Sequence, residues 1–160
     1  MSAHRYAVTS TWTGNTGSGT SGYRDYRRDV TLSVSGKHDL LASADRTFHG
    51  DAERWNPEDM LLAALSECHL LSYLHACTAR GVVVTEYVDD AEGLLILEGR
   101  AGRFASATLR PRVSVADPSM IPEALSAHDD AHAWCFIANS VSFPVSVEPV
   151  VTSARGAAPA

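Results

Sequence analysis

The sequence predicts an α+β fold: strands, a long apolar helix, further strands, a second helix and a last strand. Three observations support this order. A helix start at residues 56–59 precedes a long apolar stretch, β-branched runs lie on either side of it, and strands and helices do not alternate regularly. Grouped strands and helices are typical of α+β proteins rather than of a doubly wound parallel sheet.

Length and charge limit the classes of function. A chain of 160 residues with a net charge of −6 fits one domain, expected over residues 1–152, with a disordered tail at 153–160. Because nucleic acids and anionic membranes require basic patches, neither is an expected partner. No apolar run approaches the ~20 residues needed to cross a bilayer, and residues 1–11 lack a signal-peptide pattern. We therefore expect a cytoplasmic protein, whose three cysteines form no structural disulfide framework.

The N-terminal third predicts a hairpin followed by a long connection. Residues 5–12 alternate polar and apolar side chains and predict a strand, and residues 13–22 are a Gly/Ser/Thr-rich loop. Residues 23–34 predict a second strand that pairs back on the first. Residues 36–55 show weak periodicity and predict a long loop, of the kind that is often functional.

The long helix has clear signals at both ends. Asn56 is a good N-cap, Pro57 suits the first helical position and two acidic residues follow. Gly81 is placed to end the helix. The intervening residues are apolar on nearly every side, so the helix must be buried on most faces. A second copy of the chain packed against it would provide that cover.

The remaining elements follow from local patterns. The expected strands cover residues 82–87, 93–97 and 107–115, the second helix runs over 119–135, and a last strand covers 141–150. Pro144 suggests that the last strand is an edge strand or contains a bulge.

The cysteines and histidines are the candidates for chemistry. Cys68 lies midway along the long helix and Cys135 at the end of the second helix, and each could be a simple buried side chain. Cys77 falls on the opposite face of the helix from Cys68 and is interpreted as structural. His128 and His132 share a face with Cys135 and, together with residues 68–69, leave a soft-metal site open as an alternative. No CxxC or HExxH motif supports that alternative.

Five segments together resemble the OsmC/Ohr family (osmotically inducible and organic hydroperoxide resistance proteins). The central one is NPEDMLLAALSECH, in which a Cys follows an Asn-Pro-Glu helix start, ten residues after the Glu. The others contain the second cysteine, two strands and the Trp-Thr-Gly-Asn sequence at residues 12–15. The segments are residues 12–23, 56–69, 81–85, 109–113 and 131–140.

The resemblance implies an OsmC-like fold, with antiparallel sheets wrapped around a long central helix plus a second helix, in an intertwined homodimer. It implies a peroxidase that reduces organic hydroperoxides without a metal or organic cofactor. Cys68 would be the peroxidatic nucleophile and Cys135 the resolving thiol, recycled by a dithiol such as a dihydrolipoyl protein. Phe136 stands where better-known members have a proline.

The resemblance also implies that Glu58 pairs with an arginine that holds Cys68 as a thiolate. We favour Arg28, with Arg24 and Arg27 as alternatives. Ten helical residues span ~15 Å, so Glu58 cannot touch Cys68 of the same straight helix. An antiparallel crossing of two central helices would bring Glu58 of one chain towards Cys68 of the other.

The apolar surroundings of Cys68 suit an organic hydroperoxide. We expect Leu61 and Leu65 to contact this substrate, with Leu71 nearby. The alternative is an OsmC-like redox switch or small-ligand-binding protein that does not turn over.

Overall fold

The computed structural model describes residues 2–153, which fall into two compact parts that meet between Leu61 and Leu62. The boundary lies inside helix α1 (Pro57–Ala79). Each part is described separately below. The single domain over residues 1–152 stays a prediction. Ser153 ends a strand, and the rest of the predicted tail, residues 154–160, lies outside the described residues.

The first part contains a three-stranded antiparallel sheet. Its order is β1-β2-β3, formed by Thr9–Trp12, Val30–Ser33 and Leu40–Ala42. The predicted hairpin is present, although both strands are shorter than expected. The third strand and a 3-10 turn, Arg46–Phe48, lie within residues 36–55, so the long loop expected there contains short pieces of regular structure.

Helix α1 begins and ends within two residues of the positions predicted from the sequence. The side-chain Oδ1 of Asn56 accepts a hydrogen bond from the Asp59 N–H at 2.8 Å, which caps the first turn. Gly81 follows the helix with φ of 68°. The N–H of Val82 then donates to the carbonyl of Cys77 at 2.9 Å, as expected for a glycine-terminated helix.

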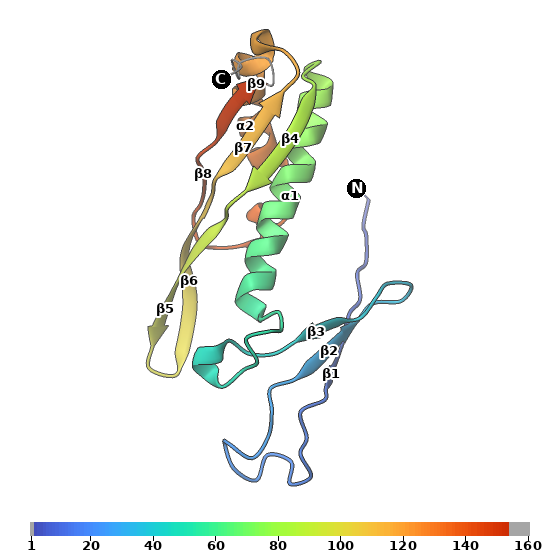
Figure 1. The fold of residues 1–160 in the computed structure, drawn as a ribbon, viewed down its shortest axis with the longest axis vertical. Helices are drawn as coiled ribbons and strands as arrows, with labels where there is room; N and C mark the ends of the chain where they lie inside the picture. Colours follow the sequence, from blue (N-terminus) through green and yellow to red (C-terminus); the bar gives the residue numbers. More distant parts are fainter. Residues whose placement is uncertain (1, 154–160) are drawn as a thin grey trace, which may run out of the picture. The chain divides into compact units, whose positions relative to one another are not determined.

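The second part contains two three-stranded sheets, drawn in yellow-green to red in Figure 1. Their orders are β4-β7-β9 and β5-β6-β8, and in both the last pair is parallel. The strands are β4 (Val84–Asp89), β5 (Glu92–Glu98), β6 (Ala101–Leu109), β7 (Pro111–Val115), β8 (Val145–Val147) and β9 (Val150–Ser153).

Two predicted strands are each divided in the structure. Residues 107–115 contain a break at Arg110, and residues 141–150 contain a break at Glu148 and Pro149, where proline has no N–H to donate. The two breaks lie next to one another. The Arg110 guanidinium donates to the Glu148 carboxylate at 3.2 Å, and it also donates to Glu92 at 2.9 Å. Pro144 precedes β8, which is an edge strand as the proline suggested.

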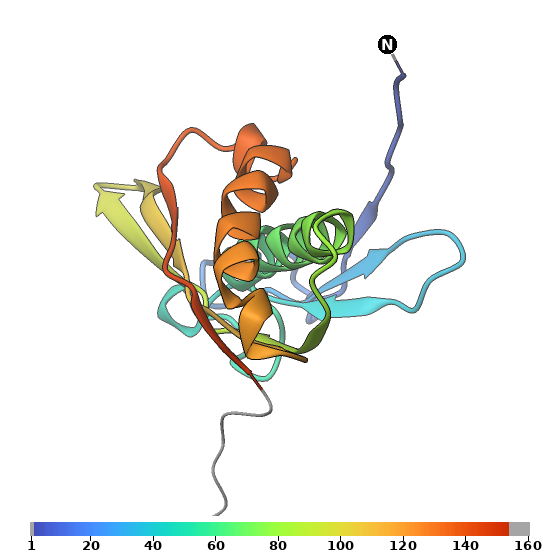
Figure 2. The same cartoon turned by 90° about the horizontal axis from the view of Figure 1, so that it is seen from above.

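Helix α2 (Ile121–Trp134) follows a 3-10 turn at Pro118–Met120, so the helix predicted over residues 119–135 is present. Figure 2, in which α1 is seen nearly end-on, shows α2 from the side, so the two helices cross. The main core forms where α1, α2 and β7 meet. Its fully buried members are Tyr73, Ala76, Cys77, Val113, Val115, Ala124, Ala127 and Ala131.

One face of α1 remains exposed in the single chain. Leu71 and Leu74 keep 58% and 38% of their surface accessible, which is high for leucines on a central helix. By length and mean hydropathy (1.2) α1 could also cross a bilayer, contrary to the expectation from the sequence. The core helix of a water-soluble protein has the same properties, and the opposite face of α1 packs against α2 and β7 of its own chain.

Candidate active site

The structure brings Cys68 and Cys135 together. Cys68 is half-buried on α1, and Cys135 is fully buried as the residue that ends α2. Both are free thiols, and the Cys68 side chain lies near enough to Cys135 to act on the pKa of its thiol. Cys77 is buried in the main core on another face of α1. The pair therefore consists of the two cysteines that the sequence singled out.

The environment of Cys135 opposes its ionisation. Burial raises the pKa of the Cys135 thiol to about 11, and the neighbouring Cys68 side chain acts in the same direction. The N–H groups of Ala138 and Ile137 act in the opposite direction, because a hydrogen bond to sulfur favours the thiolate. The Ala138 N–H lies 3.4 Å from Sγ.

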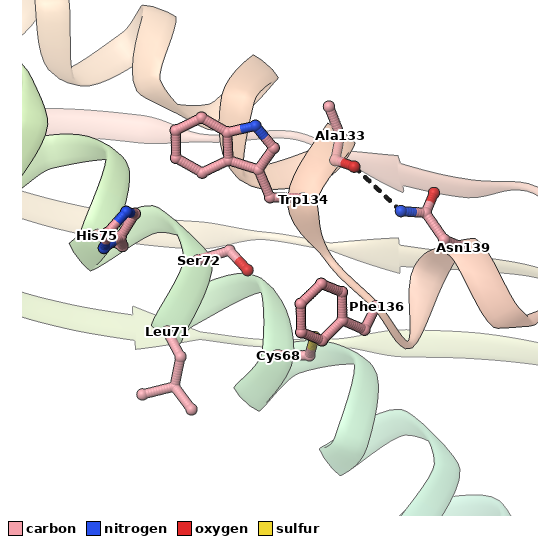
Figure 3. Close-up of a pocket in the computed structure, with 8 residues that line it drawn as sticks. All are labelled: Cys68, Leu71, Ser72, His75, Ala133, Trp134, Phe136 and Asn139. Atoms are coloured by element: carbon pink, nitrogen blue, oxygen red, sulfur yellow. Dashed lines mark hydrogen bonds between the residues drawn. The ribbon is translucent and has the colours of Figure 1, made fainter. Parts of the chain in front are cut away.

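An open pocket of about 650 Å³ borders Cys68 (Figure 3). Its walls are mainly apolar, and the indole of Trp134 packs edge-on against the His75 ring at 5.7 Å between centroids. Phe136 is 80% exposed and lies in the same wall. The lining residues are Cys68, Leu71, Ser72, His75, Ala133, Trp134, Phe136 and Asn139.

The pocket differs from the lining expected from the sequence. Leu65 is fully buried in a second core cluster with Ala107 and Leu109, so it does not line the pocket, and Leu61 is half-buried. The lining on α1 could have been predicted from helical spacing, counted from Cys68. Ser72 and His75 follow Cys68 by one and two turns and so share its face of α1.

Arg28 and Glu58 are not paired in the single chain. The Arg28 guanidinium lies over the rings of Tyr23 and Tyr26, at 4.5 and 4.3 Å from their centroids. It also donates to the carbonyls of both tyrosines. Arg27, one of the alternatives, forms an ion pair with the buried Asp29 at 3.1 Å.

Glu58 lies in the first turn of α1. Its Oε2 atom is buried and has no hydrogen-bond partner among the described residues. A buried carboxylate oxygen without a partner is costly, so this oxygen is suited to a donor from outside the single chain.

The histidines form a pair rather than a metal site. His69 Nε2 lies 3.0 Å from His128 Nδ1, and both rings are buried. Burial, followed by the charge of a neighbouring histidine, lowers the pKa of each to about 4. Within residues 2–153, no three His, Cys, Asp or Glu side chains are grouped so that they could hold a metal ion.

Several solved structures share this fold. An OsmC-like protein of unknown function from Vibrio cholerae is 28% identical, with a TM-score of 0.82 over 92% of this chain and all of that one. An organic hydroperoxide resistance protein, OsmC, from Legionella pneumophila is 16% identical, with a TM-score of 0.64 over 95% of this chain and 99% of that one. A third structure, an organic hydroperoxide resistance protein from Elizabethkingia anophelis, is 17% identical, with a TM-score of 0.66 over 94% and 98%.

The fold and the cysteine pair thus define an α+β protein of the OsmC type with two helices and antiparallel and mixed sheets. The sequence profile of the family described as OsmC-like protein matches residues 50–150. This chain belongs to the OsmC-like protein family. Among functionally curated proteins no match was found.

Proposed function

We propose that this protein is a cysteine-based peroxidase that reduces organic hydroperoxides to alcohols in the cytoplasm. The observation that carries the proposal is the proximity of the Cys68 and Cys135 thiols at the wall of an apolar pocket. Relatives of the same fold are described as organic hydroperoxide resistance proteins. The proposed reaction uses the two thiols and involves no metal or organic cofactor.

In the first step the Cys68 thiolate attacks the terminal oxygen of the hydroperoxide. The O–O bond breaks, the alkoxide leaves and takes up a proton, and Cys68 becomes a sulfenic acid. The half-buried position of Cys68 supports this role, because the sulfur borders the pocket while its helix remains packed. The apolar pocket wall favours an alkyl or aryl hydroperoxide over hydrogen peroxide.

In the second step the Cys135 sulfur attacks Sγ of Cys68. The S–O bond breaks, a disulfide forms and water leaves. An external dithiol, proposed to be of the dihydrolipoyl type, then reduces the disulfide by exchange. Full burial of Cys135 keeps this thiol away from the hydroperoxide, so it reacts with Cys68 rather than with substrate.

We propose that the working unit is a homodimer, in which Glu58 and Arg28 complete the site. Two observations support a second copy: the exposed leucines on α1 and the buried Glu58 oxygen, which has no partner within residues 2–153. Arg28 would leave its position between Tyr23 and Tyr26 or be joined there by the carboxylate.

The test is consumption of cumene hydroperoxide with dihydrolipoamide as the reductant. The native protein is expected to turn over many times, and Cys68→Ser is expected to be inactive. Cys135→Ser is expected to stall after one equivalent and over-oxidise at Cys68. Cys77→Ser is the matched control and is expected to retain activity, because this buried thiol is not part of the pair.

An OsmC-like redox switch or ligand-binding protein predicts another result. Such a protein would consume at most one equivalent of hydroperoxide per subunit with every dithiol supplied. That result would replace the peroxidase proposal, and loss of activity in Cys77→Ser alone would contradict the assignment of the cysteine pair.

A further inference from the structure

The chain makes a tight turn immediately after Cys135, through a 3-10 turn at Ala138–Ser140. The Asn139 N–H donates to the Cys135 carbonyl at 3.0 Å, which closes the turn on the cysteine itself. The Ser140 hydroxyl donates to the Phe136 carbonyl at 2.7 Å. The backbone hydrogen bond makes Cys135 the first residue of this turn.

This turn directs main-chain N–H groups at sulfur. The Ala138 N–H lies 3.4 Å from Cys135 Sγ, and the Ile137 N–H also acts on the thiol. Successive N–H groups that converge on one atom stabilise negative charge there, as in anion-binding backbone nests. Within residues 2–153, the titratable group that acts on Cys135 is the Cys68 thiol, which disfavours the thiolate.

Asn139 connects the turn to the end of α2. Its side-chain Nδ2 donates to the Ala133 carbonyl at 3.0 Å, drawn as the dashed line in Figure 3. Ala133 lies in the last turn of α2, whose carbonyls lack partners inside the helix. Asn139 therefore contacts both sides of Cys135. Its side chain holds the end of α2, and its backbone N–H closes the turn that follows the cysteine.

We propose that Asn139 is a positioning residue for the resolving step, holding the turn so that the Ala138 N–H stabilises negative charge on Cys135 Sγ. This inference rests on the proposed peroxidase function and deepens it. The step is attack of the Cys135 sulfur on the Cys68 sulfenic acid. An S–S bond forms, the S–O bond breaks, and the departing hydroxide combines with the Cys135 proton as water. The main-chain donors stabilise the negative charge that develops on this sulfur as its proton leaves.

The first experiment separates the two chemical steps in a single turnover. Asn139→Ala is expected to slow formation of the Cys68–Cys135 disulfide about tenfold, the effect of losing one well-placed hydrogen bond. Oxidation of Cys68 by hydrogen peroxide, which has no apolar group to contact the pocket wall, is followed by trapping of the sulfenic acid and is expected to change less than about twofold, since the lost bond does not involve α1. Equal slowing of both steps would overturn the proposal, because it would indicate general damage to the fold.

Ser140→Ala is the matched control. It removes a side-chain hydrogen bond from the same turn, but that bond does not hold α2. Disulfide formation in this variant is expected to stay close to the native rate. The same tenfold loss in Ser140→Ala would contradict a specific role for Asn139.

A second measurement does not depend on peroxide. In the Cys68→Ser, Cys77→Ser background Cys135 is the only thiol, and NMR of labelled cysteine follows its Cβ shift against pH. Adding Asn139→Ala is expected to raise the titration midpoint by about one pH unit, equivalent to the tenfold change in rate. An unchanged midpoint would overturn the inference. If the native protein fails to turn over peroxide, the proposed function fails while this titration still decides the role of Asn139.

Discussion

His69 on α1 and His128 on α2 share a buried hydrogen bond of 3.0 Å between Nε2 and Nδ1. The Tyr73 ring stacks on His128 with 3.9 Å between centroids, and the Tyr73 hydroxyl donates to the Ala124 carbonyl. The outer nitrogens of both imidazoles are buried and have no partner among the described residues. The pair therefore favours two neutral rings, because burial outweighs the charge of Asp89, which favours a protonated His69.

This pair predicts acid sensitivity. Burial lowers the pKa of both histidines from the ordinary 6.5 to about 4. Between these values the unfolded chain binds more protons than the folded one, so stability falls as the pH falls through that window. One such histidine contributes a loss of about 2 kcal/mol between pH 7 and pH 5. Urea unfolding at a series of pH values measures it.

His128→Phe is expected to flatten this pH dependence, even though it lowers stability at neutral pH by removing the partner of His69. The exposed His38 provides the matched control, and His38→Asn is expected to keep the native slope. A native protein equally stable at pH 7 and pH 5 would show that the pair does not remain neutral in the folded state.

If the proposed peroxidase function holds, the aromatic wall of the pocket predicts substrate selectivity. Phe136 is 80% exposed beside Cys68, so its truncation should affect the fold little. If the ring covers ~50 Å² of substrate, Phe136→Ala is expected to lower kcat/KM for cumene hydroperoxide about tenfold. The rate with hydrogen peroxide, which has no apolar group to cover, is expected to change little.

The control for this prediction is Leu125→Ala, since Leu125 is also exposed but lines a different pocket. Both substrates are expected to react with it at native rates. A Phe136→Ala protein that loses activity equally on both hydroperoxides would place the ring's role in the fold rather than in substrate binding.

The exposed face of α1 predicts the result of a sedimentation experiment. In the proposed homodimer Leu74 lies against the partner, so Leu74→Glu would bury a carboxylate without a counter-charge. Such burial costs several kcal/mol, so we expect the dissociation constant of the dimer to rise at least about 100-fold. Val88→Glu, on the exposed side of β4, is the control and is expected to sediment as the native protein does. A native protein that is monomeric at micromolar concentration would contradict the dimer itself.

Elements with local signals were predicted well from the sequence. The ends of α1 depend on Asn56, Pro57 and Gly81, each of which acts on its own backbone or on the adjoining turn. Such signals do not require knowledge of distant residues. The pairing of Cys68 with Cys135 was different, because it came from resemblance to a family rather than from any local pattern.

Features that depend on distant contacts were missed. The breaks at Arg110 and Glu148 occur together because the strands are neighbours, which the pattern within either segment does not reveal. Leu65 and Ser72 both lie close to Cys68 along α1, yet one enters the core and the other the pocket. An almost wholly apolar helix gives no periodic contrast from which to tell these faces apart.

Gly81 offers a test of how the end of α1 is stabilised. Its φ of 68° is in the left-handed region, and a Cβ added there would meet nothing within 4 Å. Any cost of Gly81→Ala is therefore conformational rather than steric against neighbours, and we expect a loss of about 1 kcal/mol. Because asparagine tolerates this conformation better, Gly81→Asn is expected to lose less. Urea unfolding of the three proteins under one condition measures the order. Equal stability of the alanine and asparagine variants would show that the end of the helix adjusts its backbone when glycine is replaced.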